Sequence, residues 1–374
     1  MLGVLDMANR GSGFLRRREA GYLPSKGDVH VGERIIRRYE LRPGDEIEGE
    51  TRPGGKGRSA TLERVTAVDG RPPDELRRRP EFSRLGAIHP NERLQLECGL
   101  MRQGQPDFTN RVIDLLCPFG KGQRALIVAP AKAGKTMVLQ SIAEGISTNY
   151  PEATLFVLLV DERPEEVFEM EALGVGEVIA SSFDNPASQH VSVAELTLER
   201  ARRRVELGED VVLIVDSLTR LARAYNTVER GTGRTLSGGL DAQSLERPKR
   251  FLGSARKVEP GQGGGSLTII ATALVDTGSR MDQVIFEEFK GTGNSELVLS
   301  RELAERRIYP AIDLVASATR REELLLPPEV LAVSRQLRQR IAGMTAINAM
   351  NDLLTDMRRN RSNEELVKAV SGER

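Results

Sequence analysis

The stretch Ala129-Pro-Ala-Lys-Ala-Gly-Lys-Thr136 decides the fold, because a β-type run (RALIV, residues 124–128) precedes it and a helical run (MVLQSIAEGI, residues 137–146) follows it. A phosphate-binding loop needs backbone N–H groups at a helix start, a lysine for the β- and γ-phosphates and a hydroxyl for Mg²⁺. The closing Gly-Lys-Thr supplies these in order. Ala129 replaces the first glycine of the usual pattern, so the strand-loop-helix context carries the prediction of a nucleotide-binding loop.

Around this loop, apolar strands alternate with helical stretches from about residue 111 onward. Alternation of this kind predicts a mostly parallel sheet with helices on both faces. The runs VLLV and VVLIV are continuously apolar, which is typical of central parallel strands. Strands are expected at residues 124–129, 154–160, 178–182, 210–216, 268–273, 297–300 and 308–312, and helices at residues 135–149, 165–173, 188–206, 218–225 and within 328–370.

The first 75 residues have a different pattern, with short β-type runs separated by Gly- and Pro-containing turns. The runs cover residues 2–7, 13–16, 28–31, 46–51 and 60–68. Five short strands of this spacing predict a small all-β barrel of the OB type. We therefore expect a barrel over residues 1–75, a connector over 76–110 that begins with a proline-rich, charged segment, and a P-loop domain over 111–374 with a helical C-terminal end.

Composition excludes several classes of protein. The chain has 374 residues with 54 Lys+Arg and 54 Asp+Glu, so it is not a polycation, and its two cysteines are too few for a disulfide scaffold. No apolar run approaches the roughly 20 residues that cross a bilayer, and the N-terminus does not resemble a secretory signal. We therefore expect a cytoplasmic protein with no membrane partner.

Positive charge is clustered near the N-terminus in three runs of arginine: Arg16-Arg17-Arg18, Arg37-Arg38 and Arg77-Arg78-Arg79. Such clusters can bind phosphates. The alternative is an ordinary solvated surface in which carboxylates pair with the arginines, and charge alone favours that alternative.

Two carboxylates stand at the ends of predicted strands. Asp216 closes VVLIVD, where it is suited, with Thr136, to hold Mg²⁺, and Glu162 in LFVLLVDER is suited to deprotonate an attacking water. A third requirement is a cation for the charge that develops on the γ-phosphoryl group. Arg307 and Arg320 are both candidates, and the residues alone do not choose between them.

Two glycine-rich loops with basic residues complete the motifs, at residues 226–239 (NTVERGTGRTLSGG) and 288–294 (EFKGTGN). Loops of this composition can present backbone groups and a cation to a polyanion. A plain flexible connection is an equally good interpretation of each.

Long segments of the chain resemble the family of bacterial transcription termination factor Rho. They include VAPAKAGKTMVLQSIA, LLVDERPEEV, LIVDSLTRLARAYNTV, SLTIIATALVDTGSRMDQVIFEEFKGTGN and ERRIYPAIDLVASATRREELL, and they cover nearly all of residues 111–326. The first hundred residues resemble the family's RNA-binding barrel through GSGFLR and IIRRYELRPGDEIEGETRP. The resemblance implies a RecA-like ATPase domain behind an OB-type barrel, assembled as a homohexamer that uses ATP and Mg²⁺ to translocate on single-stranded RNA and release the transcript from RNA polymerase.

The resemblance also implies roles for residues. Glu162 is similar to the catalytic glutamate, Asp216 to the Mg²⁺-associated aspartate, and Arg320 to the arginine that reaches the neighbouring subunit's ATP. The implied ATP-binding set is Gly120, Lys121, Gly122, Gln123, Arg124, Ala125, Lys132, Ala133, Gly134, Lys135, Thr136, Met137, Arg163, Arg307 and Tyr309, the last in place of an aromatic that stacks on adenine. The implied RNA-binding set is Gly11, Ser12, Gly13, Phe14, Leu15, Arg16, Asp28, Val29, His30, Arg58 and Ser59 in the barrel, with Arg234, Thr235, Leu236, Ser237, Gly238, Gly239 and Lys290 in the two loops.

The barrel departs from the family at its aromatic positions. His30 stands where a tyrosine is common, and Ser12 and Ser59 stand where aromatics are common. Because stacking contributes roughly 1–3 kcal/mol per base, we expect weakened or altered RNA binding there. Two alternatives remain open: a rotary-type ATPase subunit of the same fold, which needs no RNA for turnover, and a non-catalytic RNA-binding ring that uses ATP only to stay closed.

Overall fold

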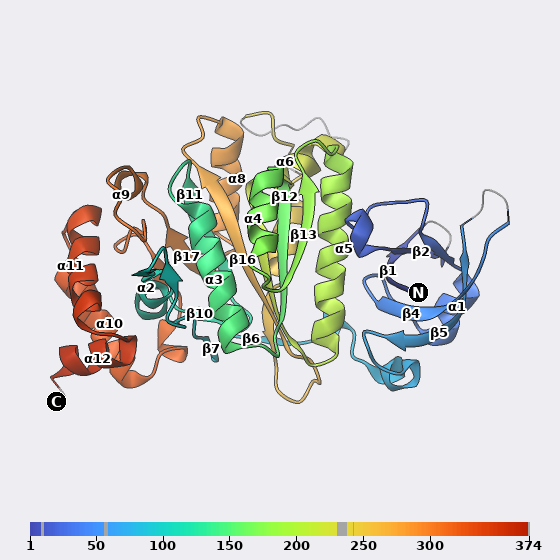
Figure 1. The fold of residues 1–374 in the computed structure, drawn as a ribbon, viewed down its shortest axis with the longest axis horizontal. Coiled ribbons are helices and arrows are strands. Elements are labelled where there is room, and N and C mark those ends of the chain that lie inside the picture. The colour runs from blue at the N-terminus through green and yellow to red at the C-terminus, as the bar shows by residue number, and fades with distance from the viewer. Residues whose placement is uncertain (9–10, 56–58, 230–237, 242, 373–374) are drawn as a thin grey trace.

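The computed structural model of the chain describes residues 1–8, 11–55, 59–229, 238–241 and 243–372. A small barrel lies at one end, the C-terminal helices lie at the other, and a large sheet flanked by helices lies between them (Figure 1). This arrangement confirms the predicted fold classes. In the described part of the chain, no helix has the length and apolar character needed to cross a bilayer.

The barrel is closed by five strands in the order β1-β2-β3-β5-β4. Four of the side chains in its core, Leu5, Leu15, Ile47 and Leu62, are at most 2% exposed. The strands are β1 (Leu2–Met7), β2 (Gly13–Arg16), β3 (Val29–Val31), β4 (Glu46–Arg52) and β5 (Thr61–Val68), which confirms the five predicted β runs. A helix between β3 and β4, α1 (Glu33–Tyr39), was not predicted; it buries only Ile36, so its apolar pattern is weak.

The large domain is built on a nine-stranded sheet. Seven strands follow the order β13-β12-β14-β16-β11-β17-β18, and β15 and β6 are added beside β16. All pairs from β13 to β17 along this order are parallel, as predicted. The strands are β6 (Ala87–Ile88), β11 (Arg124–Pro130), β12 (Thr154–Glu162), β13 (Glu177–Ser182), β14 (Asp210–Asp216), β15 (Arg256–Val258), β16 (Ser266–Val275), β17 (Ser295–Val298) and β18 (Ala318–Thr319).

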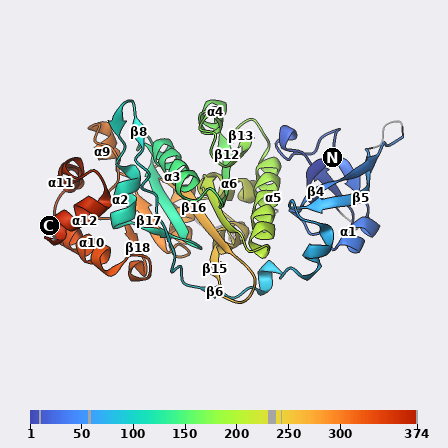
Figure 2. The ribbon, with the colours of Figure 1, turned by 60° about the horizontal axis from the view of Figure 1, so that its bottom comes forward.

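Helices cover both faces of the sheet, which explains why its central strands are apolar throughout (Figures 1 and 2). Leu155, Val157 and Leu159 of β12 join one core, while the alternating Phe156 and Leu158 join the other. The first core is shared with α2 (Thr109–Leu116), α3 (Lys135–Asn149), α10 (Pro328–Ile341), α11 (Ala346–Arg359) and α12 (Asn363–Ser371); the second with α5 (Ala187–Glu206), α6 (Leu218–Val228), α7 (Glu246–Gly253) and α8 (Arg280–Lys290). Two further helices are α4 (Pro164–Ala172) and α9 (Arg301–Glu305).

One predicted strand is wrong. Residues 308–312 form no strand: the chain bends at Tyr309 and Pro310, which a cis bond joins, and only Ile312 forms an isolated bridge, to Leu299. Pro310 lacks the N–H that a strand interior needs, so the apolar pattern of this segment reflects packing of Ala311 and Ile312 into the core.

The segment between barrel and sheet is structured. It contains 3₁₀ turns (Pro73–Arg78 and Phe82–Arg84), the short pair β7 (Arg93–Leu94) with β10 (Phe119–Gly120), and a hairpin of β8 (Met101–Arg102) and β9 (Gln105–Pro106). Arg79 of this segment is only 4% exposed and donates to both carboxylate oxygens of Asp45 at 2.6 and 2.7 Å. Arg42 of the barrel pairs with Glu206 of α5 at 2.7 Å. The pair of the half-buried Arg42 with the buried Glu206 therefore holds the barrel against α5, and the Arg79–Asp45 pair holds the connecting segment against the barrel.

Candidate functional site

The predicted phosphate loop lies between β11 and α3. Ala129 is a fully buried residue of β11, and Gly134 immediately precedes the first residue of α3 with φ of 84°, a left-handed conformation that favours glycine. A Cβ atom on Gly134 would lie 3.6 Å from Cε1 of Tyr309. The ring of Tyr309 therefore lies over the loop, where it can stack on a nucleotide base.

Lys135 connects the loop to the two predicted carboxylates. Its Nζ lies 2.6 Å from Oδ1 of Asp216 and 3.0 Å from Oε1 of Glu162. Both carboxylates are buried, and Thr272 also donates to Asp216 at 2.7 Å. The structure thus brings together Lys135, Glu162 and Asp216, residues far apart in the sequence.

The sheet explains this meeting. Asp216 ends β14 and Glu162 ends β12, and these neighbouring parallel strands place their carboxyl ends at one edge. The register of β12 shifts between Val160 and Glu162, where Asp161 has φ of 57°. At this irregularity the regular alternation of side chains along β12 is interrupted, just before Glu162.

Electrostatics at the site favour a carboxyl that can exchange a proton near neutral pH. Burial, and then the negative charge of Asp216, raise the pKa of Glu162 to about 7. Burial alone would lower the pKa of Lys135, but Asp216 and Glu162 together hold it above its usual value. Lys135 therefore stays charged while Glu162 is suited to act as a base.

Two residues that the sequence reasoning missed contact this group. Glu166 of α4 brings a third carboxylate, and oxygens of Glu162, Glu166 and Asp216 lie within 4.8 Å of one another. Arg220 of α6 lies 3.4 Å from Glu162 and also donates to the backbone carbonyl of Asp161. Glu166 lies four residues after Glu162, and Arg220 lies four residues after Asp216. This spacing was the signal in the sequence that could have identified them. Carboxylates and the Thr136 hydroxyl are hard oxygen donors, so this set fits Mg²⁺.

The predicted ATP-binding residues divide between two ends of β11. Lys132, Ala133, Gly134, Lys135, Thr136, Met137 and Arg163 follow the carboxyl ends of β11 and β12, Tyr309 adjoins Gly134, and Arg307 follows α9. Gly120 to Ala125 lie at or just before the amino end of β11 instead. β11 has seven residues, so at about 3.3 Å per residue its ends are roughly 20 Å apart.

Arg320 lies at the amino end as well. It follows β18, and its backbone N–H donates to the carbonyl of Asn294, the residue that also accepts a bond from the Arg124 N–H. Arg320 is exposed, and among the described residues it forms no ion pair. Arg320 therefore lies across the sheet from the Lys135 of its own chain.

In the barrel, an aromatic and basic cluster lies on β2 and β3. The rings of Phe14 and His30 meet edge to face with centroids 5.5 Å apart, and the Arg16 guanidinium lies 5.4 Å from the Phe14 centroid. Arg16 is held by Asp6 and Asp28, each at 2.6 Å. Of the other predicted RNA-binding residues, Leu15 and Val29 belong to the barrel core, and Gly13 is the first residue of β2. Gly11 and Ser12 precede β2, Ser59 precedes β5, and Arg58 lies outside the described residues.

The described residues Gly238 and Gly239 of the first predicted loop lie at the other end of α8 from Lys290 of the second. A Cβ atom on Gly238 would lie 2.7 Å from the Met281 nitrogen, so Gly238 and its neighbour Gly239 adjoin the first turn of α8, whereas Lys290 is the last residue of that helix. The residue beside Gly238 is Arg280, which the sequence reasoning missed. Predicted residues Arg234, Thr235, Leu236 and Ser237 lie outside the described residues.

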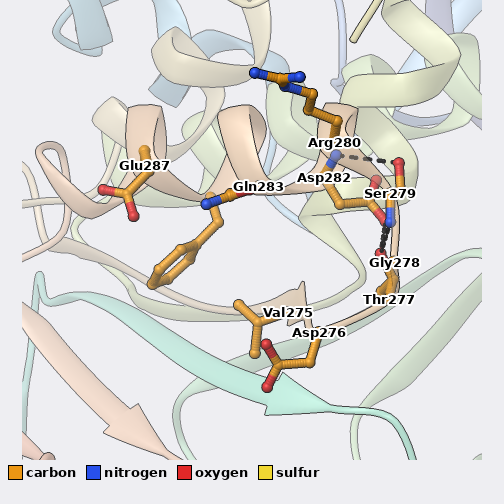
Figure 3. Close-up of a pocket in the computed structure, with 10 residues that line it drawn as sticks. Val275, Asp276, Thr277, Gly278, Ser279, Arg280, Asp282, Gln283 and Glu287 are labelled. Carbon is orange, nitrogen blue, oxygen red and sulfur yellow. Dashed lines mark hydrogen bonds between the residues drawn. The ribbon is translucent and has the colours of Figure 1, made fainter. Parts of the chain in front are cut away.

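A pocket of about 640 Å³ opens beside this contact (Figure 3). Its lining includes the turn from Asp276 to Arg280 and the side chain of Asp282, which the Arg223 guanidinium and Thr277 hydroxyl contact at 2.6 to 2.7 Å. This turn follows β16, at the same edge of the sheet as Lys135. Arg280 and Gly238 therefore lie next to each other at this edge of the sheet.

Known proteins match both domains. Residues 1–74 match the RNA-binding domain of Rho termination factor, and residues 109–319 match the nucleotide-binding domain of the ATP synthase alpha/beta family. Among solved structures, a prototypical ATPase from the type III secretion system of pathogenic bacteria is 25% identical with a TM-score of 0.58, over 70% of this chain and 83% of that chain. The assembled ATPase EscN from enteropathogenic E. coli has the same identity and TM-score, over 78% of this chain and 65% of that chain.

Curated relatives match nearly the whole chain. Transcription termination factor Rho of Gemmatimonas aurantiaca is 55% identical over 99% of this chain, which spans half the length of that relative. The Rho proteins of Buchnera aphidicola subsp. Schizaphis graminum and of Escherichia coli K12 are 53% and 52% identical over 97% and 98% of this chain, which spans 86% and 87% of their lengths. Lys135, Glu162 and Asp216 thus stand in a chain that shares more than half its residues with these proteins, and the chain belongs to the transcription termination factor Rho family.

Proposed function

We propose that this protein is an RNA-dependent ATPase and helicase that binds nascent RNA, translocates along it as a homohexameric ring and releases the transcript from RNA polymerase in the cytoplasm. The observation that carries the proposal is the contact of Lys135 with Glu162 and Asp216 at the edge of the sheet. A lysine held by two strand-end carboxylates directly behind a phosphate loop is suited to phosphoryl transfer.

The chemistry assigns a role to each group. The Lys135 ammonium binds the β- and γ-phosphates, and the Tyr309 ring stacks on the base. Thr136 and Asp216 would hold Mg²⁺, whose charge neutralises the phosphates when it is bound. Glu162 takes the proton of the attacking water, for which a pKa of about 7 is well matched to neutral pH.

The remaining cation comes from a neighbouring subunit. Arg320 lies roughly 20 Å across the sheet from the Lys135 of its own chain, too far to reach the same γ-phosphate. Gly120 to Ala125 share its edge. In a ring of identical subunits, this edge would lie against the ATP bound to the next subunit. Arg320 would then complete the next subunit's site, and residues Gly120 to Ala125 would lie beside that nucleotide.

RNA binds in two places under this proposal. The barrel, over residues 1–75, holds bases on Phe14 and His30, and the segment 76–110 links it to the ATPase domain, residues 111–374. The second place is the contact of Gly238 and Gly239 with Arg280. We assign a cation of this second place to Arg280, which adjoins Gly238, whereas α8 separates Lys290 from Gly238 by about 15 Å.

The test is ATP hydrolysis by the purified protein with no nucleic acid, with poly(C) RNA and with DNA of matched length, at one fixed salt concentration. We expect strong stimulation by RNA alone and none in a Lys135→Ala control. A rotary-type ATPase is the second candidate, favoured by the match of residues 109–319 to the ATP synthase alpha/beta family. Turnover that is fast without RNA and unchanged by it would favour that candidate and contradict the proposal.

A further inference from the structure

We propose that His190 is a positioning residue for ATP hydrolysis, which holds Asp161 in place and, through it, the base Glu162. His190 lies in the first turns of α5, which packs beside β12 and β13 (Figure 1). Its two ring nitrogens face Ser181 and Asp161, neither of which we assign to ATP or Mg²⁺. The inference rests on the proposed function, because it takes Glu162 to be the base.

The first contact anchors the histidine ring. His190 Nδ1 lies 2.7 Å from the Ser181 hydroxyl oxygen, and both residues are buried. The Asn185 amide donates to the same oxygen at 3.4 Å, so the hydroxyl hydrogen is placed to point at Nδ1 and the ring proton lies on Nε2. Burial lowers the pKa of His190 against the opposing charge of Asp161, so the ring is neutral near neutral pH.

The second contact faces Asp161. His190 Nε2 lies 4.0 Å from Oδ1 of Asp161, which is longer than a direct hydrogen bond but close enough for the Nε2–H dipole to attract the carboxylate. Arg220 Nη1 lies 3.2 Å from the other oxygen, Oδ2. The Asp161 side chain is 36% exposed, so these two partners are what keep it from turning toward solvent. The carboxylate is therefore held between His190 and Arg220.

Two connections lead from Asp161 to Glu162. Arg220 not only holds the Asp161 carboxylate but also places its Nε 3.4 Å from Oε1 of Glu162. Asp161 is the residue before Glu162, and its φ of 57° is a left-handed conformation that is costly outside glycine. Arg220 also donates to the Asp161 carbonyl. A displaced Asp161 therefore moves both the guanidinium beside Glu162 and the backbone that carries it.

The anchor of His190 is itself fixed relative to Glu162. Ser182 pairs with Glu162 between β13 and β12, and the Phe183 N–H donates to the Glu162 carbonyl at 3.3 Å. Both residues directly follow Ser181, which holds the His190 ring. The ring therefore has a defined position beside the end of β12, and Nε2 is the atom through which it acts.

The experiment compares two amide variants of His190 by steady-state ATP hydrolysis with saturating RNA. An asparagine amide keeps a partner for the Ser181 hydroxyl but is too short to reach Asp161, whereas a glutamine amide donates from the position of Nε2. We expect His190→Asn to lower kcat roughly 10- to 100-fold with little change in KM for ATP, because a misplaced base leaves substrate binding intact. His190→Gln should restore most of kcat. His89→Asn, at an exposed histidine between β6 and β7, is the matched control and should hydrolyse ATP like the parent.

A double variant tests whether His190 acts through Asp161. In an Asp161→Ala background, His190→Asn should cause little further loss, because the group that it positions is already gone. Full additivity of the two losses would overturn the inference, as would a parent-like kcat in His190→Asn or a loss that His190→Gln fails to restore. Thermal melting checks the fold of each variant. Asp161→Asn, which leaves α5 and β13 untouched, carries the test if His190→Asn melts below the assay temperature, and a parent-like kcat there would also overturn the inference.

Glu162→Gln separates this inference from the proposed function. Loss of hydrolysis in Glu162→Gln together with parent-like hydrolysis in His190→Asn would refute only the role of His190. Undiminished turnover in Glu162→Gln would refute the base itself, and the role of His190 with it.

Discussion

Complementation between two inactive variants tests where Arg320 acts. Lys135→Ala removes the phosphate-binding cation from a subunit's own site, and Arg320→Ala removes the cation that we assign to the neighbour's site. Each variant alone should lose ATP hydrolysis, with Arg320→Ala costing roughly 10³-fold or more. Because β11 separates the two residues by roughly 20 Å, no site can take both from the same chain.

The expected recovery follows from the geometry. In rings assembled from equal amounts of the two variants, a site is intact only when an Arg320→Ala subunit supplies Lys135 and a Lys135→Ala subunit supplies Arg320. Random assembly makes about one quarter of the sites intact. The assay is phosphate release in the presence of RNA, after the variants have been denatured and refolded together.

The matched control is a mixture of Lys135→Ala with Glu162→Gln. Both residues belong to the same subunit's half of the site, so every site in that mixture lacks one of them and no activity should return. Equal recovery in the two mixtures, or no recovery in either despite proven mixing of subunits, would refute the assignment of Arg320 to the neighbour.

Three further outcomes are expected. Glu162→Gln should lower hydrolysis by roughly 10²–10⁴-fold while a fluorescent ATP analogue still binds, and undiminished turnover would remove Glu162 as the base. Phe14→Ala should weaken oligo(C) binding by roughly 1–3 kcal/mol in fluorescence anisotropy without changing hydrolysis in the absence of RNA; an unchanged affinity would place RNA elsewhere on the barrel. Burial and then Asp45 raise the pKa of Asp69 to about 7, so the folded state binds this proton more tightly than the unfolded chain and loses stability as pH rises toward 7. Asp69→Asn should therefore gain stability over the parent at pH 8 but not at pH 3, by at most about 4 kcal/mol in urea unfolding, whereas a pH-independent difference would contradict the shift.

The parts of the site that depend on local backbone were predictable from the sequence. A helix start after a strand fixes the positions of Gly134, Lys135 and Thr136, and a continuously apolar strand identifies its own end, which led to Glu162 and Asp216. Locating the loop residues and the two carboxylates requires only knowing where a single strand or helix begins and ends. Their meeting at one edge follows because parallel strands share a polarity.

The parts that depend on non-local pairing were not predictable. The edge on which Arg320 lies follows from the pairing of β18 with β17, and the separation of Lys290 from Gly238 follows from the direction of α8. The sequence alone also could not decide whether the arginine runs are free to bind phosphates or are paired with carboxylates. Arg79 is buried on Asp45, and Arg16 is held by Asp6 and Asp28, so folding neutralises charges that the sequence shows only as clusters.

The junction between the domains limits how RNA binding in the barrel can affect hydrolysis. α5 has 20 residues, about 30 Å, and at its first turns His190 Nδ1 lies 2.7 Å from the Ser181 hydroxyl beside the catalytic edge. At its last turn, Glu206 contacts Arg42 at 2.7 Å and Arg79 at 3.8 Å. Removing one partner of a buried ion pair costs roughly 3–5 kcal/mol, so independent rocking of the barrel, which would break these pairs, is strongly opposed. Under the proposed function, RNA held by the barrel would therefore move with its own ATPase domain. Coupling between RNA and ATP would then operate through displacement of whole subunits, at the interface to which we assign Arg320.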